Sequence, residues 1–300
     1  MRNKSLAGAN YLSSLNAFFK LVRIEHALMY AIAVLIGAVI VGGIEAVSAF
    51  ILIGALAAMF LEFGAFALND YIDLKADRIN GRIDRPLVTG EISPSMALLI
   101  GFFSFIFANL ISFIYLPIQA FYIIFLFTML SLLYDFILKN LPLIGNIIIA
   151  LTMAVPFFFG AFILAVEKNI PVVQFQPVLC LSAIAFFVGL GREIIKDIED
   201  MKGDQAIGGK TLPILIGKRN AARFAVLLFF IGIILSIIPF FTFFSGRPLY
   251  LTVLITDIML ADVSLHVLKD QSIQNLRKSR KMSLIAIGIG LISFLLSSIF

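Results

Sequence analysis

Long runs without a charged residue are the feature of this sequence that most restricts its fold. The longest run, residues 92–134, has 43 residues, which is too long for one bilayer crossing and enough for two with a turn near Pro117. Hydrophobic residues make up 61% of the 300-residue chain and charged residues 14%, against about 45–50% and about 25% in soluble domains. A soluble fold cannot bury so much apolar surface, so we expect lipid to surround most of this chain.

Further runs with few or no charges bring the expected number of transmembrane helices to nine. Strands of a membrane β-barrel would alternate apolar and polar residues over about ten positions, and the sequence shows no such pattern. We therefore predict an all-α membrane protein with nine transmembrane helices, organised as a single domain over residues 1–300. The remaining runs are residues 27–44, 46–69, 140–166, 169–191, 224–246, 248–267 and 282–300.

Basic residues gather on one side of this nine-helix arrangement. Of the 23 Lys and Arg residues, 21 fall there, including Arg2 and Lys4, and only Lys168 and Arg247 fall on the other side. Because Lys and Arg stay in the cytoplasm, the chain is predicted to lie in the cell membrane with its N-terminus inside. Basic residues at membrane edges predict no nucleic-acid partner, and we expect no obligate protein partner. The single cysteine, Cys180, excludes an internal disulfide and a zinc site of several thiolates.

Two acidic clusters, residues 70–77 and 197–204, share one spacing. Each cluster closes an even-numbered helix on the predicted cytoplasmic side. Lys75 and Lys202 match at the same offset of 127 residues as the aspartates, which indicates a weak parallel repeat inside the chain. The matching aspartates are Asp70, Asp73 and Asp77 in the first cluster and Asp197, Asp200 and Asp204 in the second.

The spacing of these aspartates favours a metal site. Residues at positions i, i+3 and i+7 lie within about 60° on a helix, so each trio forms one acidic stripe. Oxygen ligands alone suit Mg²⁺, or Mn²⁺ and Ca²⁺, and Mg²⁺ usually adds phosphate oxygens to one or two carboxylates. One such cluster is more often a solvated helix end, but two in register predict a metal-bridged diphosphate. Basic residues near enough in sequence to bind it are Lys75, Arg78, Arg82, Arg85, Lys139, Lys196 and Lys202.

The residues around both clusters resemble the UbiA superfamily of intramembrane prenyltransferases. The resemblance covers residues 23–217 in the family's order, about two thirds of the chain. It is carried by Asn69, Asp70, Asp73 and Asp77, by Arg82, Arg85-Pro86-Leu87 and Gly90, by Tyr134, Lys139 and Gly145-Asn146, by Arg192-Glu193-Ile194, Lys196, Asp197, Asp200, Gly203 and Asp204, and by Thr211-Leu212-Pro213 and Gly217.

This resemblance implies nine helices around a central cavity, with a cap formed by the two acidic loops. It implies that Lys139 and Arg82 hold the diphosphate. The nearest metal ligands would be Asn69, Asp73, Asp200 and Asp204, supported by Asp70, Asp77 and Asp197.

Residues 77–86 and 192–200 look most like the archaeal branch of the family. That branch transfers a geranylgeranyl group from geranylgeranyl diphosphate to the free hydroxyl of geranylgeranylglyceryl phosphate, releasing diphosphate. The reaction makes the second ether bond of archaeal membrane lipids. The resemblance therefore implies a Mg²⁺-dependent transferase whose substrates are an isoprenoid diphosphate and an isoprenoid glyceryl phosphate in the bilayer.

Several further residues are candidates for catalysis or acceptor binding. The ring of Tyr134 is a candidate for stabilising an allylic cation, and Asp70 and Asp197 are candidates for the base. We expect Arg23, His26 and Glu62 to bind the acceptor, since Arg23 lies at the mouth of the first span and an acid inside a span is costly. Asp257, Asp262 and His266 have no assigned role; they could pair inside the bundle or line a polar path.

Two other functions stay open at this point. The same acidic clusters would serve an aromatic-acceptor prenyltransferase of quinone, haem or chlorophyll type. A cation or lipid transporter would also carry repeats and intramembrane acids. The acids here gather at one membrane face rather than at the midplane, and the basic set suits an anion, which favours the enzyme.

Overall fold

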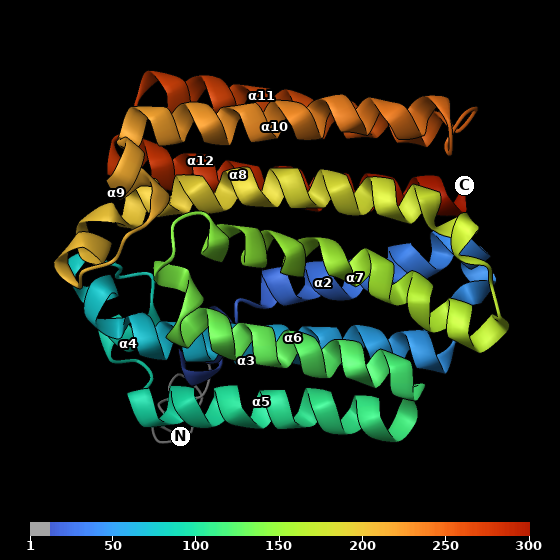
Figure 1. Cartoon of the computed structure of the whole chain (residues 1–300), viewed down its shortest axis with the longest axis horizontal. Helices are drawn as coiled ribbons and strands as arrows, with labels where there is room; N and C mark the ends of the chain where they lie inside the picture. The colour runs from blue at the N-terminus through green and yellow to red at the C-terminus, as the bar shows by residue number, and fades with distance from the viewer. Residues whose placement is uncertain (1–12) are drawn as a thin grey trace, which may run out of the picture.

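The computed structural model describes residues 13–300, where every regular element is helical (Figure 1). Nine helices in this part are long and apolar enough to cross a membrane, which confirms the predicted all-α, multi-pass fold. Short helices α4 (Pro86–Thr89) and α9 (Leu212–Ile216) lie between them. The long helices are α2 (Ile24–Gly42), α3 (Ala49–Ile79), α5 (Pro94–Tyr115), α6 (Ile118–Phe136), α7 (Ile144–Lys168), α8 (Gln176–Ala206), α10 (Lys218–Phe241), α11 (Val253–Lys269) and α12 (Ile273–Ile299).

Helices α8 and α12 lie in the middle of the bundle. They separate the α10 and α11 pair from α2 and α7, and α3, α5 and α6 lie beyond these (Figure 1). The connections from α3 to α5, from α6 to α7 and from α8 to α10 meet at one end of the bundle, on the left in Figure 1. We call it the acidic end, because both acidic clusters lie in the last turns of α3 and α8.

Several helices extend beyond the hydrophobic runs that predicted them. Helix α12 begins at Ile273 rather than at residue 282, and α10 begins at Lys218 rather than at residue 224. The hydroxyl of Ser272 caps α12 by accepting a hydrogen bond from the Asn275 backbone N–H at 3.3 Å. Hydropathy marks the part of a helix that lipid covers, whereas capping marks where the helix begins. Arg2 and Lys4, counted in the charge bias, lie outside the described residues.

The offset of 127 residues extends from the acidic clusters to the whole surrounding architecture. Helices α3 and α8 both have 31 residues and begin and end 127 residues apart. Gly81 and Gly208 share this offset, with φ of 62° and 81°, and so do Gly90 and Gly217, with φ of 79° and 81°. These left-handed turns favour glycine, so the chain reverses at equivalent points after each acidic helix.

Helices α2 and α7 cross at unusually close range, which fixes one wall of the bundle. A Cβ atom on Gly37 would lie 1.8 Å from the carbonyl oxygen of Phe157, and one on Gly160 would lie 1.9 Å from that of Val34. Only glycine permits this approach, as is common where transmembrane helices pack by small residues. The crossing holds the first turn of α2 beside α8, where the candidate site lies.

Candidate active site

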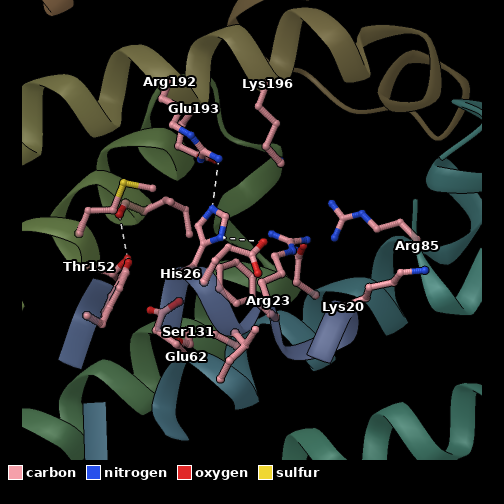
Figure 2. Close-up of a pocket in the computed structure, with 18 of the residues that line it drawn as sticks. Lys20, Arg23, His26, Glu62, Arg85, Ser131, Thr152, Arg192, Glu193 and Lys196 are labelled. Carbon is pink, nitrogen blue, oxygen red and sulfur yellow. Dashed lines mark hydrogen bonds and ion pairs between the residues drawn. The ribbon is translucent and has the colours of Figure 1, made fainter. Parts of the chain in front are cut away.

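A cavity of about 440 Å³ opens at the acidic end between α2, α3, α6, α7, α8 and α12. It is the central cavity that the family resemblance implies. Figure 2 shows side chains from several of these helices pointing into it, with Lys196 and Arg85 on one side and His26 near the middle. The residues predicted from the sequence that line it are Arg23, His26, Glu62, Asn69, Arg82, Arg85, Tyr134 and Lys196.

The two acidic clusters face one another because α3 and α8 meet at their last turns. The side-chain amide of Asn80 donates to the Asp200 carbonyl oxygen at 3.1 Å, and its oxygen accepts the Gly203 backbone N–H at 2.7 Å. A Cβ on Gly203 would lie 2.3 Å from the Asn80 amide nitrogen. The absence of a side chain at Gly203 therefore allows the clusters to approach.

The predicted metal ligands pair with the predicted diphosphate-binding cations. The Asp70 carboxylate, which is 1% exposed, accepts from Arg85 and, at 2.9 Å, from Arg23. Lys139 pairs with Asp73 across 66 residues of sequence. These pairs bring groups from α2, α3 and the α6–α7 connection to one place, as expected for one charged site.

The same pairing occurs in the second cluster. Arg82 Nη1 donates to Asp200 Oδ1 at 2.9 Å, and Lys196 Nζ lies 3.8 Å from the other oxygen of that carboxylate. Arg82 comes from the loop after α3 and Lys196 from α8, so the ion pairs bridge the two halves of the chain.

Amide side chains complete the set, and two partners were not predicted. Asn69 donates its amide to Asp135 at 2.9 Å, and Asn146 donates to Asp197 at 2.7 Å. Asp135 lines the cavity beside Tyr134. The available signals were the position of Asp135 next to the Tyr134 candidate and the Gly145-Asn146 pair of the family motif.

The side chains predicted to bind the metal are chemically suited to a magnesium ion. Throughout residues 13–300, no three His, Cys, Asp or Glu side chains form a group that could hold a metal, since Arg, Lys and Asn side chains hold the carboxylates instead. All the candidate donors are nevertheless hard oxygens, which Mg²⁺ prefers. Asp70 Oδ2 is buried and has no hydrogen-bond partner in the described chain, so it has capacity for a cation.

Arg82 is held in the charged form by its neighbours in the cap loop. Burial lowers the pKa of Arg82, but its hydrogen bonds to Asp84 and the charges of Asp200 and Glu199 raise it above the usual value. Burial likewise raises the pKa of Asp84, and the bonds from Arg82 at 3.1 and 3.0 Å outweigh this and lower it below the ordinary range. The loop after α3 therefore presents a permanent cation beside the second cluster.

An unpredicted carboxylate, Glu199, ties α12 to this loop. Its side chain is 2% exposed and accepts from Arg280 Nη1 at 2.5 Å and Arg277 Nε at 3.0 Å, with Arg82 Nη1 at 3.8 Å. Arg280 also lines the main cavity. Sequence reasoning placed the arginines of α12 in a loop at the membrane edge, and only the packing of α12 on α8 brings them here.

The predicted acceptor-binding residues come from the N-terminal end of α2 and from α3, and all three line the cavity. Arg23, in the left-handed region with φ 46°, has its guanidinium carbon 4.2 Å from the centre of the Phe66 ring. His26 Nε2 lies 3.1 Å from Arg192 Nη2, as the dashed line in Figure 2 marks. Glu62 is buried at 4% exposure and lines the cavity floor near Tyr30.

Two small apolar cavities continue from the main one, and Tyr30 borders all three. One, of about 30 Å³, runs between α3, α6 and α7. The other, of about 70 Å³, lies between α2, α7, α8 and α12. Two apolar spaces therefore lie next to the polar cavity.

Some predicted residues do not reach the cavity. Lys75, Arg78 and Lys202 are exposed on α3 and α8, Asp77 is buried and Asp204 is half-buried. The other predicted residues that do not line the cavity are Asp70, Asp73, Lys139, Asp197 and Asp200.

In α11, Asp257 accepts from the Ser236 hydroxyl at 2.8 Å, so it pairs inside the bundle. His266 Nδ1 lies 3.5 Å from the exposed Asp262.

Comparisons with known proteins agree with this fold. The UbiA prenyltransferase family matches residues 27–285. A digeranylgeranylglyceryl phosphate synthase of Archaeoglobus fulgidus is 38% identical over 290 residues, covering 93% of this chain and 94% of that protein. A solved structure of a digeranylgeranylglyceryl phosphate synthase in membranes is 28% identical, with a TM-score of 0.67, covering 95% of this chain and 99% of that one.

A solved UbiA homologue of Archaeoglobus fulgidus, bound to DMAPP and Mg²⁺, is 20% identical with a TM-score of 0.58, covering 92% and 98% of the two chains. At this identity the likeness concerns the fold. The family match over residues 27–285 and the relative of 38% identity show that this chain belongs to the UbiA prenyltransferase family.

Proposed function

We propose that this protein is a Mg²⁺-dependent prenyltransferase that makes digeranylgeranylglyceryl phosphate. It transfers a geranylgeranyl group from geranylgeranyl diphosphate to the free hydroxyl of geranylgeranylglyceryl phosphate. The observation that carries the proposal is the pair of facing acidic clusters, whose carboxylates pair with Arg and Lys side chains that line a cavity beside smaller apolar ones. The relative with 38% identity supports this acceptor.

The metal and diphosphate site would use the ion pairs described above. Asn69, Asp73, Asp200 and Asp204 would be the nearest Mg²⁺ ligands, with Asp70, Asp77 and Asp197 supporting them. Bound Mg²⁺ supplies positive charge that stabilises diphosphate as a leaving group. The solved homologue bound to DMAPP and Mg²⁺ supports this assignment by analogy within the family.

The diphosphate would give the basic side chains a second anion to pair with. Arg82 and Lys139 would bind it, as would Arg85 and Lys196, which also line or border the cavity. Pairing of these cations with the diphosphate would leave the carboxylates of Asp70, Asp73 and Asp200 free to hold the metal. Lys75, Arg78 and Lys202 are exposed, and their binding to the diphosphate stays a prediction.

The chemical step breaks one bond and forms another at the same carbon. The allylic C1–O bond breaks and its electron pair leaves with diphosphate, while the apolar walls keep water from the allylic cation. Tyr134, which lines the cavity, would stabilise this cation with its ring face. The glycerol oxygen attacks C1, and its proton passes to a carboxylate or to a diphosphate oxygen.

Candidates for that proton acceptor differ in their access to the cavity. Asp70 and Asp197, the predicted bases, do not line the cavity in this structure. Glu62 and Glu193 do line it. We keep Asp70 and Asp197 as the predicted bases and Arg23, His26 and Glu62 as the predicted acceptor site.

The active site is proposed to face the cytoplasm. The acidic end carries most of the basic residues of the chain, and Lys and Arg are retained on the cytoplasmic side of membranes. Water-soluble diphosphate product would then leave directly into the cytoplasm.

A panel of acceptors tests the function. Purified protein is given geranylgeranyl diphosphate, Mg²⁺ and, separately, geranylgeranylglyceryl phosphate, an aromatic acid and a quinone precursor. We expect mass analysis to detect the digeranylgeranyl product and equimolar diphosphate. Alkylation of only the aromatic compounds would favour the aromatic alternative, and movement of cation or lipid across vesicles without diphosphate release would favour a transporter.

A further inference from the structure

Arg192 in α8 is a buried guanidinium with unused hydrogen-bonding capacity. Its side chain is 7% exposed, and its ion pair with Glu193 is long, at 3.4 Å. Its Nε is buried and has no hydrogen-bond partner within residues 13–300. Its Nη2 points to His26 across the main cavity, as Figure 2 shows. Buried guanidinium groups normally donate hydrogen bonds to anions, so the Arg192 guanidinium can bind a further anion.

Arg280 in α12 is a second arginine with a buried, unpaired nitrogen among the described residues. One of its nitrogens binds Glu199, but its Nε is buried and lacks a hydrogen-bond partner among the described residues. Arg280 and Arg23 both lie close enough to Arg192 to repel it electrostatically. Three guanidinium groups from α2, α8 and α12 thus line one cavity, an arrangement that an anion with several charged oxygens would stabilise.

The surroundings of these arginines match a lipid with a charged head. His26 and Arg192 border both the polar cavity and the apolar cavity of about 70 Å³. The walls of that apolar cavity include Met29, Ala33 and Leu291. A phosphate on the arginines would therefore have an apolar wall directly beside it, which suits the first carbons of an attached hydrocarbon chain.

We infer that Arg192 and Arg280, together with His26, bind the phosphate of a lipid phosphate monoester, the acceptor of the reaction. This inference rests on the proposed function and deepens it. Arg82 and Arg85 pair with Asp200 and Asp70, the proposed metal-site acids.

Arg192 and Arg280 pair with Glu193 and Glu199, which lie outside both aspartate trios, and Arg82 meets Arg280 at Glu199, at 3.8 Å from that carboxylate. The cavity therefore holds two anion sites, one for diphosphate with its metal and one for the acceptor phosphate. The second site selects a phosphorylated acceptor over a neutral or aromatic alcohol.

The test separates binding of the two substrates. Arg192→Gln, Arg280→Gln and the control Arg277→Gln are purified in lipid nanodiscs. Arg277 shares Glu199 with Arg280 but does not line the cavity. Retention of radiolabelled geranylgeranylglyceryl phosphate is measured without donor, and KM values are then measured for the acceptor and for geranylgeranyl diphosphate separately.

We expect both cavity variants to weaken acceptor retention and raise the acceptor KM at least about tenfold, the effect of losing a charge-assisted contact. The donor KM should change less than about twofold, and Arg277→Gln should behave as the wild type. Arg192→Lys should recover part of the binding, which distinguishes lost charge from a folding defect. Thermal unfolding confirms that each variant is folded.

Unchanged acceptor retention in both variants overturns the inference, as does an equal rise in both KM values, which would place the arginines at the diphosphate. Failure of the proposed function looks different. In that case the wild type retains the phosphorylated lipid, and loses it on Arg192→Gln, but does not prenylate it.

Discussion

The side chain of Asn80, at the end of α3, makes two hydrogen bonds to α8. Its oxygen accepts the Gly203 backbone N–H at 2.7 Å, and its amide donates to the Asp200 carbonyl oxygen at 3.1 Å. This contact sets the separation of the two aspartate clusters. It joins residues 123 positions apart in the sequence and depends on the lack of a side chain at Gly203.

Gly203→Ala should push the ends of α3 and α8 apart. Its Cβ would lie 2.7 Å from the carbonyl oxygen of Ala76, which is backbone and cannot move aside easily. We expect turnover to fall at least about tenfold, because small misplacements of catalytic groups are costly. Turnover and thermal unfolding are measured together, with Gly101→Ala as the control, since a Cβ there has ordinary contacts of 3.4 Å or more. Equal turnover in both variants would refute this role for Gly203.

Asp73→Asn and Asp200→Asn should each reduce turnover more than about 10²-fold while the protein stays folded, since metal-assisted charge stabilisation supplies several kcal/mol. Asp262→Asn is the control, because Asp262 is exposed and pairs only with His266 among the described contacts. Loss of Mg²⁺ binding in the presence of inorganic diphosphate, measured by calorimetry, should accompany the loss of turnover. Near-normal rates in both cluster variants would be incompatible with the metal-ligand assignment.

Gly37→Ala and Gly160→Ala should each destabilise the fold by about 1–3 kcal/mol, the usual range for overpacking a core. Each Cβ would overlap a backbone carbonyl of the facing helix. The free energy of unfolding in mixed micelles gives the measurement, again against Gly101→Ala. A stability equal to that of the control would mean that α2 and α7 are free to separate.

Acid should remove the contribution of Asp84 to stability. Its pKa is lowered: burial raises it, but the bonds from Arg82 outweigh this effect. The pair therefore stabilises the folded state above the ordinary aspartate pKa of about 3.9, and this contribution is lost as the pH falls through the lowered value. Asp84→Asn should lower the melting temperature at pH 7, and the two curves should converge in acid. A gap that persists at low pH would count against the pair.

The sequence predicts the spans well, because a charge-free run of about 20 residues has few alternatives to crossing a bilayer. It predicts helix ends less well. The first turns of α12 are polar and lie outside the apolar run, yet they are helical and carry Arg280 into the site.

Residues of the candidate site can be predicted from the sequence where they lie at a regular spacing along one helix. The aspartate trios are predicted this way and stay a prediction as metal ligands. Lys75 and Lys202 follow Asp73 and Asp200 by two residues, about 200° around a helix, and so they are exposed. Glu199 and Arg280 could not be identified from local sequence, because their contacts arise only when distant helices pack together.

The repeat at an offset of 127 residues has a consequence for how the two substrates are held. Equivalent positions carry unlike groups: Asn69 corresponds to Lys196, and Arg85 corresponds to Leu212. Two like scaffolds therefore enclose an asymmetric chamber, with a guanidinium on one side where the other has an aliphatic side chain. Donor and acceptor are not interchangeable in such a chamber, because each would meet a wall of different charge.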